Sequence, residues 1–302
     1  MGSETKKAVT LGSFDGLHRG HMSVIACAFD LQKKCGLSPL TLLFDSHPML
    51  TIMNNAPAKI MQDEIRDELL AEIGVERHII SFREIKDMSC REFFEKILIG
   101  RLNAGGVCCG WNYRFGKGNE GGCNVLSKLC AEYGLELEIA PPIDFDGSPI
   151  SSTRIRRAIE SGDITLANSM LGREFRYRLI VSDGDHRGRL MGAPTINQHF
   201  EPGFIHPKRG VYASMTVLDG KIYPSVTNIG LRPSFENEDY RSETCILGFE
   251  GDLYGQIVEV RLLQFIRNEI RFDSMEDLGK QIRNDAEKSK EIFNNRGVSG
   301  NV

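Results

Sequence analysis

The chain has 302 residues, which is enough for two domains of ordinary size. Its composition, 41% apolar and 26% charged, is that of a globular protein, and its formal charge of −4 offers no broad basic surface for a nucleic acid. No apolar run approaches the ~18 residues that span a membrane, the N-terminus lacks a signal-peptide core, and the eight cysteines include no C-x-x-C pair. We therefore expect a cytoplasmic protein with reduced thiols. It should act on small molecules and have no obligate protein partner.

Short apolar runs alternate with helical patterns in the first half of the chain. Strands are expected at Ala8–Leu11, Pro39–Phe44, His78–Phe82, Gly106–Cys109 and Leu135–Ile139, and helices at His21–Lys34, Ile60–Ile73, Cys90–Leu102 and Val125–Tyr133. This alternation predicts a parallel sheet with crossover helices.

The second half contains short strands separated by glycine, proline and aspartate. Strands are expected at Tyr177–Val181, Val211–Leu218, Ile222–Val226, Glu243–Phe249 and Ile257–Phe265, followed by a helix at Met275–Phe293. Such spacing predicts a closed antiparallel sheet. The change of pattern places a domain boundary between residues 172 and 173, so that 1–172 and 173–302 form separate domains.

The segment GSFDGLHRGH lies where the first strand meets the first helix. Its glycines let a phosphate approach the backbone, and the helix N-terminus presents unpaired amides. His18 and His21 can donate to phosphate oxygens as charge moves onto departing pyrophosphate, although a single histidine at this place is more often just a helix cap. The turn residues expected to hold the nucleotide are Gly12, Ser13, Phe14, Asp15 and Gly16.

G-x-F-D-G-x-H-x-G-H resembles the flavin-adenylylating branch of the nucleotidylyltransferase superfamily, which transfers a nucleoside monophosphate and releases pyrophosphate. ISSTRIRRAI is similar to the S-S-T-x-I-R stretch of that superfamily, which closes over the ATP phosphates. The resemblance implies that Ser151, Ser152 and Thr153 contact phosphate, and that Arg156 neutralises charge on the leaving group. Alone, S-S-T before a helix is most often a cap.

GWNYRFGKG resembles the G-x-D/N-F-R-F-G loop that helps to hold the flavin nucleotide, and this implies flavin contacts for Asn112 and Arg114. Asn112 stands where aspartate is more usual. FDSHP resembles the F-x-P-H-P of the same family, with Ser46 in place of the first proline. His47 in that segment is equally well explained as a turn residue.

GDHRGRLMGAPTIN is rich in glycine but lacks the G-K-[ST] of a P-loop, which excludes P-loop phosphoryl transfer. Gly188 and Gly192 would let ATP approach the backbone beside Pro194. Thr195 and Asn197 would share one side of an extended segment. Their neutral oxygens suit a Mg²⁺ ion that carries nucleotide phosphates. Without further motifs, a proline-threonine turn would be the better interpretation.

Further motifs are present: GVYA, NIGLRPSF and ETCILGF follow in order, and together they resemble the riboflavin kinase domain. The resemblance implies that Glu243 is the catalytic base and that Asn228 contacts the substrates. Ala193, Ser234 and Cys245 depart from the family pattern. FIRNEIRFDSMEDL resembles the segment over the flavin, which implies flavin contacts for Arg267, Arg271 and Phe272; a solvated helix start explains each of them nearly as well.

On these two motif sets the chain is identified as a member of the bacterial bifunctional riboflavin kinase/FMN adenylyltransferase (FAD synthetase) family. The resemblance implies a Rossmann-like nucleotidylyltransferase domain, then a six-stranded antiparallel riboflavin-kinase barrel with a C-terminal helix. It implies ATP and Mg²⁺ as cofactors and riboflavin, FMN and FAD as substrates and products. Two alternatives remain: an FMN adenylyltransferase whose barrel binds flavin with weak kinase activity, and a flavin-binding protein without turnover.

Overall fold

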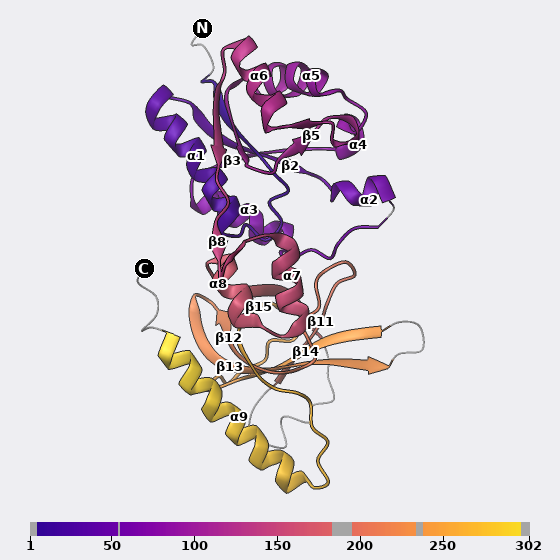
Figure 1. The fold of residues 1–302 in the computed structure, drawn as a ribbon. Helices are drawn as coiled ribbons and strands as arrows, with labels where there is room; N and C mark the ends of the chain where they lie inside the picture. Colours follow the sequence, from indigo (N-terminus) through magenta and orange to yellow (C-terminus); the bar gives the residue numbers. More distant parts are fainter. Residues whose placement is uncertain (1–4, 54, 183–194, 234–237, 297–302) are drawn as a thin grey trace. The chain divides into compact units, whose positions relative to one another are not determined.

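The computed structural model of the chain describes residues 5–53, 55–182, 195–233 and 238–296. Contacts divide the chain into two compact units, whose ribbons are drawn in Figure 1. One comprises Met1–Pro57 with Asp63–Ser152, and the other Ala58–Gln62 with Thr153–Val302. No helix in these described ranges is long and apolar enough to cross a membrane.

The first unit is built on a five-stranded sheet with the strand order β3-β2-β1-β4-β7, in which every pairing is parallel. Its strands are β1 (Lys7–Leu11), β2 (Ser38–Phe44), β3 (Glu76–Ile80), β4 (Ala104–Gly110) and β7 (Glu136–Ala140). Its helices are α1 (Arg19–Cys35), α2 (Pro48–Met53), α3 (Asp63–Glu72), α4 (Phe82–Ile85), α5 (Cys90–Glu92), η1 (Phe93–Arg101), η2 (Lys117–Asn119) and α6 (Cys123–Tyr133). Two short hairpins, β5 (Arg114–Phe115) with β6 (Gly121–Gly122) and β8 (Asp144–Phe145) with β9 (Ser148–Pro149), complete it.

Helices cover both faces of this sheet. Val9 and Leu11 of β1 point into the buried cluster that contains η1 and α6. Their neighbour Ala8 points to the opposite face because side chains alternate along a strand. There α1 packs on β1, β2, β4 and β7, with Ile25 and Leu31 fully buried. The parallel sheet with crossover helices is therefore confirmed.

Some predicted boundaries in this unit are wrong. The helix expected at Ile60–Ile73 begins only at Asp63, where two acidic residues occupy its first turn, as suits a helix N-terminus. The third strand lies two residues earlier than expected, and Phe82 starts α4. The helix expected at Cys90–Leu102 is one turn of α-helix that continues as the π-helix η1.

The second unit is a closed barrel of six antiparallel strands in the order β10-β11-β14-β13-β12-β15. The strands are β10 (Phe175–Ser182), β11 (Thr195–His199), β12 (Gly210–Leu218), β13 (Lys221–Pro233), β14 (Glu238–Ile246) and β15 (Ile257–Arg267). Helices α7 (Ser152–Ser161), α8 (Ile164–Leu171) and α9 (Met275–Asn295) accompany it. The six-stranded barrel and its C-terminal helix are confirmed. β13 runs seven residues past the predicted end at Val226, and β14 begins and ends earlier than predicted.

The barrel interior is lined by hydroxyl groups as well as apolar side chains. The Tyr177 hydroxyl and Ser242 Oγ lie 2.7 Å apart, Thr227 Oγ1 lies 2.8 Å from Thr244 Oγ1, and Ser214 Oγ lies 2.8 Å from Thr227 Oγ1. All five residues are fully buried. Because each hydroxyl can donate and accept, the chain satisfies these buried polar groups without water. Residues that alternate with them, such as Glu243, therefore face the outside of the barrel.

Helix α9 is held on the outside of the barrel by an ion pair. The Arg267 guanidinium at the end of β15 donates to both carboxylate oxygens of Asp285, with Nη2 2.7 Å from Oδ2. Asp285 is 3% exposed, so the bidentate pair compensates for the burial of its charge. Further along α9, Ser289 Oγ donates to the Ser225 carbonyl oxygen at 2.6 Å.

Residues ahead of the first barrel strand also belong to this unit. Helix α8 packs on β10 and β15, and its Ile164, Met170 and Leu171 side chains are almost wholly buried. Asn168 Nδ2 donates to the Leu262 carbonyl, while Asn168 Oδ1 accepts from the Phe175 amide. The segment Ala58–Gln62, from much earlier in the chain, adds a parallel bridge between Lys59 and Phe204. Gln62 Nε2 donates to the Arg178 carbonyl oxygen, and Gln62 Oε1 accepts from the Arg178 amide.

These contacts predict how fragments of the second unit behave. A fragment that starts at Thr153 should fold cooperatively, whereas one that starts at Arg173 should be less stable by about 5 kcal/mol, because it loses three large buried side chains at ~1.5–3 kcal/mol each. Urea unfolding of both fragments measures the difference. Both lack residues 58–62, so the comparison isolates α7 and α8. Equal stabilities would favour the boundary predicted between 172 and 173.

Candidate functional site

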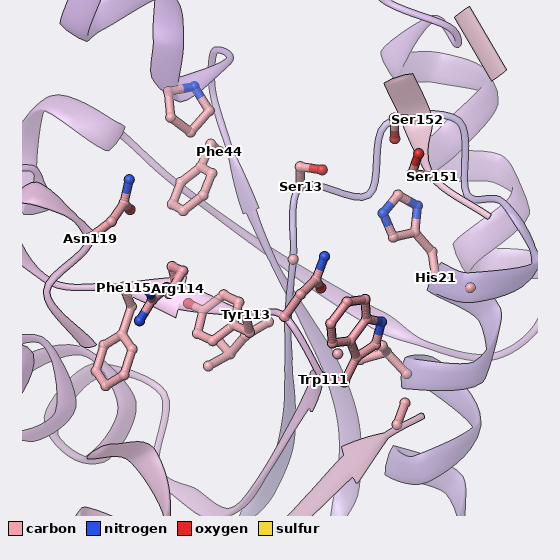
Figure 2. Close-up of a pocket in the computed structure, with 18 of the residues that line it drawn as sticks. Ser13, His21, Phe44, Trp111, Tyr113, Arg114, Phe115, Asn119, Ser151 and Ser152 are labelled. Carbon is pink, nitrogen blue, oxygen red and sulfur yellow. The ribbon is translucent and has the colours of Figure 1, made fainter. Parts of the chain in front are cut away.

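The order of the strands in the parallel sheet identifies where a ligand can enter. From β1 the chain moves outward through β2 to β3 and then returns to β4 on the other side of β1. Ligands of such sheets bind in the crevice at the carboxyl ends of the strands where the order reverses. A cavity of about 540 Å³ lies at these ends. It is lined by the last residues of four strands, Leu11, Phe44, Gly110 and Ala140 (Figure 2).

The turn after β1 is tight and buried. Phe14 has a φ of 50° and Leu17 a φ of 39°, values that cost energy for residues with a side chain, while Gly16 has a φ of 83°. Phe14 is fully buried, and its ring centroid lies 5.3 Å from that of His21. The strain is compensated by this packing. Gly12 and Ser13 line the cavity, whereas Phe14, Asp15 and Gly16 support the turn behind it.

His18 is the N-cap of α1. Its Nδ1 accepts a hydrogen bond from the His21 amide at 3.2 Å, so the proton of the neutral ring lies on Nε2. A side chain at Gly20 would bring its Cβ within 3.2 Å of the His18 ring, which explains the glycine between the two histidines. Capping by Nδ1 is compatible with the phosphate-binding interpretation of His18, which would use the other ring nitrogen.

The two histidine rings are stacked and both line the cavity. Their centroids lie 3.7 Å apart at an interplanar angle of 14°. His18 is 5% exposed, whereas His21 is half-buried. The N-terminus of α1, a helix of 17 residues, opens at the same place. Two imidazole rings and a helix N-terminus therefore lie at one cavity, a combination whose chemistry suits an anionic ligand.

The S-S-T segment is joined to this turn by a hydrogen bond. Ser152 Oγ donates to the Asp15 carbonyl oxygen at 3.1 Å, and both Ser151 and Ser152 line the cavity. Two motifs 137 residues apart in the sequence thus meet at one site. Thr153 and Arg156 follow on α7, in the other unit, where Arg156 Nε donates to the Ala58 carbonyl at 2.7 Å.

The loop after β4 contributes the two residues predicted from its motif. Asn112 and Arg114 are exposed and line the cavity. Tyr113 between them is stacked on Phe115 with centroids 5.8 Å apart. Burial raises the pKa of the Tyr113 hydroxyl, so this group is neutral at physiological pH. His47 accepts from the Met49 amide with Nδ1, as a turn residue would.

Sequence analysis missed the aromatic and apolar wall of the cavity. This wall consists of Phe44, Phe82, Phe93, Trp111, Tyr113 and Phe115. Phe44 and Phe82 meet edge to face at 5.4 Å, and Phe93 lies 5.9 Å from Phe115. One residue of this wall could have been recognised from the sequence: Phe44 is an aromatic residue at the carboxyl end of a predicted strand, the edge of a parallel sheet at which ligands bind.

The barrel brings the predicted kinase residues into one row. Asn197 on β11 is directly opposite Glu243 on β14, and Glu243 is directly opposite Asn228 on β13. Residues opposite one another in antiparallel strands share a face, so the three side chains lie side by side on the outside of the barrel. Thr195 lies two residues from Asn197 and is exposed on the same face.

The remaining predicted residues of this unit have different surroundings. Arg267 pairs with Val211, the other neighbour of Asn228, but its guanidinium is bound to Asp285. Arg271 is exposed and Phe272 half-buried, 6.0 Å from the Arg267 guanidinium. Gly188, Gly192 and Pro194 lie outside the described residues.

Cys245 occupies the position where the family pattern has histidine. It lies opposite Thr195 in the ladder and is 9% exposed. Burial raises the pKa of its thiol, so the side chain is neutral at physiological pH. A neutral, buried thiol cannot supply the charge or the second nitrogen that a histidine would bring there. The departure leaves Glu243 and Asn197, which pair two residues further along the same strands, in register.

Comparison with known proteins also divides the chain into two parts. The FAD synthetase family model matches residues 2–154, and the riboflavin kinase family model matches residues 171–293. The bifunctional riboflavin kinase/FMN adenylyltransferase of Listeria monocytogenes is 32% identical, over 96% of this chain and 94% of that protein. The protein of the same name from Escherichia coli strain K12 is 34% identical, over 94% of this chain and 92% of that protein.

A solved structure is similar to this chain over nearly the full length. The crystal structure described as that of a macrolide-efflux protein from Streptococcus pneumoniae has a TM-score of 0.88 and 30% identity, and the match covers 96% of this chain and 95% of that chain. Both family models and the full-length relatives lead to one assignment. The chain belongs to the family of bifunctional riboflavin kinase/FMN adenylyltransferases.

Proposed function

We propose that this chain phosphorylates riboflavin to FMN in its barrel and adenylylates FMN to FAD in its parallel-sheet unit, using ATP in both steps. The first reaction is supported by the row Asn197–Glu243–Asn228. The second is supported by the cavity that His18 and His21 share with Ser151 and Ser152. The eight free cysteines are in keeping with a reducing, cytoplasmic setting.

Adenylylation requires stabilisation of a leaving pyrophosphate. An oxygen of the FMN phosphate forms a bond to the α-phosphorus of ATP, and the bond from that phosphorus to the bridging oxygen breaks. The electron pair of this bond leaves with pyrophosphate. His18 Nε2–H, His21 and the amides at the start of α1 are donors placed for the growing negative charge. We place Ser151, Ser152 and Thr153 on the phosphates, and Arg156 on the leaving group.

Phosphorylation requires a base for the hydroxyl of riboflavin. In our proposal Glu243 accepts the proton of the ribityl 5′-hydroxyl while the oxygen of that hydroxyl attacks the γ-phosphorus of ATP. The bond from this phosphorus to the bridging oxygen breaks, and ADP leaves with the bridging oxygen. Asn228, beside Glu243, is placed to position the substrate hydroxyl; its Nδ2 lies 3.3 Å from Glu269 Oε1. Gly188, Gly192 and Pro194 are assigned to the nucleotide.

The residues around Glu243 fit a Mg²⁺ ion that arrives with ATP. Thr195 and Asn197 offer neutral oxygens on one face of β11, with the Glu243 carboxylate next to Asn197. Hard cations of this kind bind oxygen ligands and keep the phosphates of the nucleotide among them. No group of three His, Cys, Asp or Glu side chains among the described residues could hold a metal without the nucleotide. When bound, the ion would neutralise part of the negative charge on the phosphates of ATP.

One assay separates the proposal from its two alternatives. Purified protein is incubated with riboflavin, ATP and Mg²⁺, and the flavins are resolved over time. FMN and then FAD are expected. FAD from supplied FMN alone would favour a monofunctional adenylyltransferase. No product from either flavin would favour a binding protein.

For the adenylylating cavity, we expect His21→Ala to reduce FAD formation from FMN by about 10²–10³-fold, because loss of one preorganised donor costs ~2.7–4 kcal/mol in the transition state. FMN formation from riboflavin should persist, since the kinase residues lie in the barrel. Both rates are measured on the full chain. His78→Ala, the same substitution on β3 outside the cavity, is the matched control. An unchanged FAD rate in the His21 variant would remove this residue from the mechanism.

For the barrel, we expect Glu243→Gln to reduce FMN formation by ~10²–10⁴-fold, because glutamine cannot accept a proton at neutral pH. FAD formation from supplied FMN should stay near the wild-type rate. Glu250→Gln, at an exposed turn, is the matched control. If Glu243 were only an exposed carboxylate, the change would alter the free energy of unfolding by less than ~0.5 kcal/mol and leave both activities intact. That outcome would contradict the assignment of the base.

A further inference from the structure

Trp111 is the only tryptophan in the chain, and it lies on the cavity wall. Its side chain is 51% exposed, although a large aromatic ring gains most from burial. Neither of the two proposed reactions uses the Trp111 side chain. A half-exposed aromatic ring on a ligand cavity is a surface on which a flat ring can stack.

The Trp111 backbone is fixed on both sides of the residue. Its amide donates to the Ala140 carbonyl at 3.0 Å, which ties it to the end of β7. Its carbonyl accepts from Cys123 Sγ at 3.3 Å, at the start of α6. The ring therefore projects from a rigid base, and this limits the entropy that stacking would cost.

The cavity has two chemically different ends, and backbone hydrogen bonds link Trp111 to the segment that leads to the serines of the polar end. From Ala140 the chain runs through two prolines to Ile143, whose carbonyl accepts from the Ile150 amide at 2.9 Å. Ser151 and Ser152 follow directly. The wall that begins at Trp111 thus leads to the serines beside the histidine turn.

The other end holds the phenylalanine rings of Phe44, Phe82, Phe93 and Phe115, with the polar side chains of Arg114 and Asn119 drawn on the same side in Figure 2. In the view of Figure 2, Trp111 is drawn on the side of His21, whereas Phe44 and Phe115 are drawn on the other side. An isoalloxazine ring is larger and more apolar than adenine, so the phenylalanine end suits the flavin. Of the two ligands, ATP carries the pyrophosphate that the proposed donors would stabilise, so the ring on the histidine side suits its adenine.

We infer that Trp111 stacks on the adenine of ATP in the adenylylating cavity and sets the affinity for that nucleotide. This inference rests on the adenylylation proposed above. Trp111 is a positioning residue, since it holds the base and does not touch the α-phosphorus. Stacking of this kind is the same before and during the reaction, so it should change KM for ATP and leave kcat largely unaltered.

The intrinsic fluorescence of Trp111 gives a direct test on the full chain. α,β-Methylene-ATP is titrated against the protein, with inorganic tripolyphosphate as a probe that has the phosphates without the base. We expect saturable quenching with the nucleotide and none with tripolyphosphate. Nucleotide bound in the barrel is silent in this measurement, because the barrel has no tryptophan. Equal responses to both probes, or none to the nucleotide, would overturn the inference.

Kinetics provide the second test. Trp111→Ala should raise KM for ATP in FAD formation by about 5- to 100-fold, the range expected for one lost base stack. Trp111→Phe should restore most of that loss, and KM for FMN should not change in either variant. Tyr254→Ala, at an aromatic residue that is 64% exposed outside the cavity, is the matched control.

The outcomes separate this inference from the proposed function. If the wild-type chain forms no FAD from FMN and ATP, the adenylylation itself fails. If it forms FAD but Trp111→Ala leaves KM for ATP unchanged, only the adenine contact fails. A rise in KM for FMN instead of ATP would place the flavin on Trp111 and reverse the orientation of the two ligands.

Discussion

The hydrogen bonds between neighbouring strands bring together, in both units, residues that are far apart in the sequence. In the parallel sheet they align the carboxyl ends of β1, β2, β4 and β7, so that Leu11, Phe44, Gly110 and Ala140 border one cavity. In the barrel they set Asn197, Glu243 and Asn228 on one rung of three strands. A shift of the strand register by one residue would turn these side chains to the opposite face of the sheet, and they would no longer lie side by side.

His18 illustrates how one side chain can serve structure and chemistry together. Its Nδ1 satisfies an amide at the start of α1, a common structural task for a residue at that position. The same hydrogen bond holds the ring at the edge of the cavity and favours the tautomer with its proton on Nε2. The structural task of His18 is therefore compatible with the donor role that we propose for it. A variant that loses the cap would also lose the orientation of the ring.

The barrel shows a different division of labour. The interior hydroxyl groups of Ser214, Thr227 and Thr244 form hydrogen bonds with one another. The outer face carries the predicted chemistry. Arg267, expected from its motif to contact flavin, is instead bound to Asp285 and fixes α9 on the barrel. A flavin contact by Arg267 would have to leave that ion pair intact or replace it.

Much of this protein is determined by the sequence alone. The period of its apolar residues predicts the parallel sheet and the barrel, because side-chain burial follows the geometry of strands and helices. The family follows from GSFDGLHRGH, SSTRIR and ETCILGF, because short polar motifs must keep their order and spacing to act on phosphates. The histidine pair, both serines of the cavity and Glu243 were all predicted in this way.

The tertiary structure decided the rest, because it depends on contacts between distant segments. The meeting of Ser152 with Asp15, the rung shared by Asn197 and Glu243, and the side of the cavity on which Trp111 lies are set by strand register and loop closure. Residues 60–62 were predicted to begin a helix, yet they belong to the segment Ala58–Gln62 that pairs with the barrel unit, since tertiary hydrogen bonds outweigh weak local propensity. A sequence pattern indicates the conformation that a segment favours by itself. The tertiary structure shows whether contacts with distant segments override it.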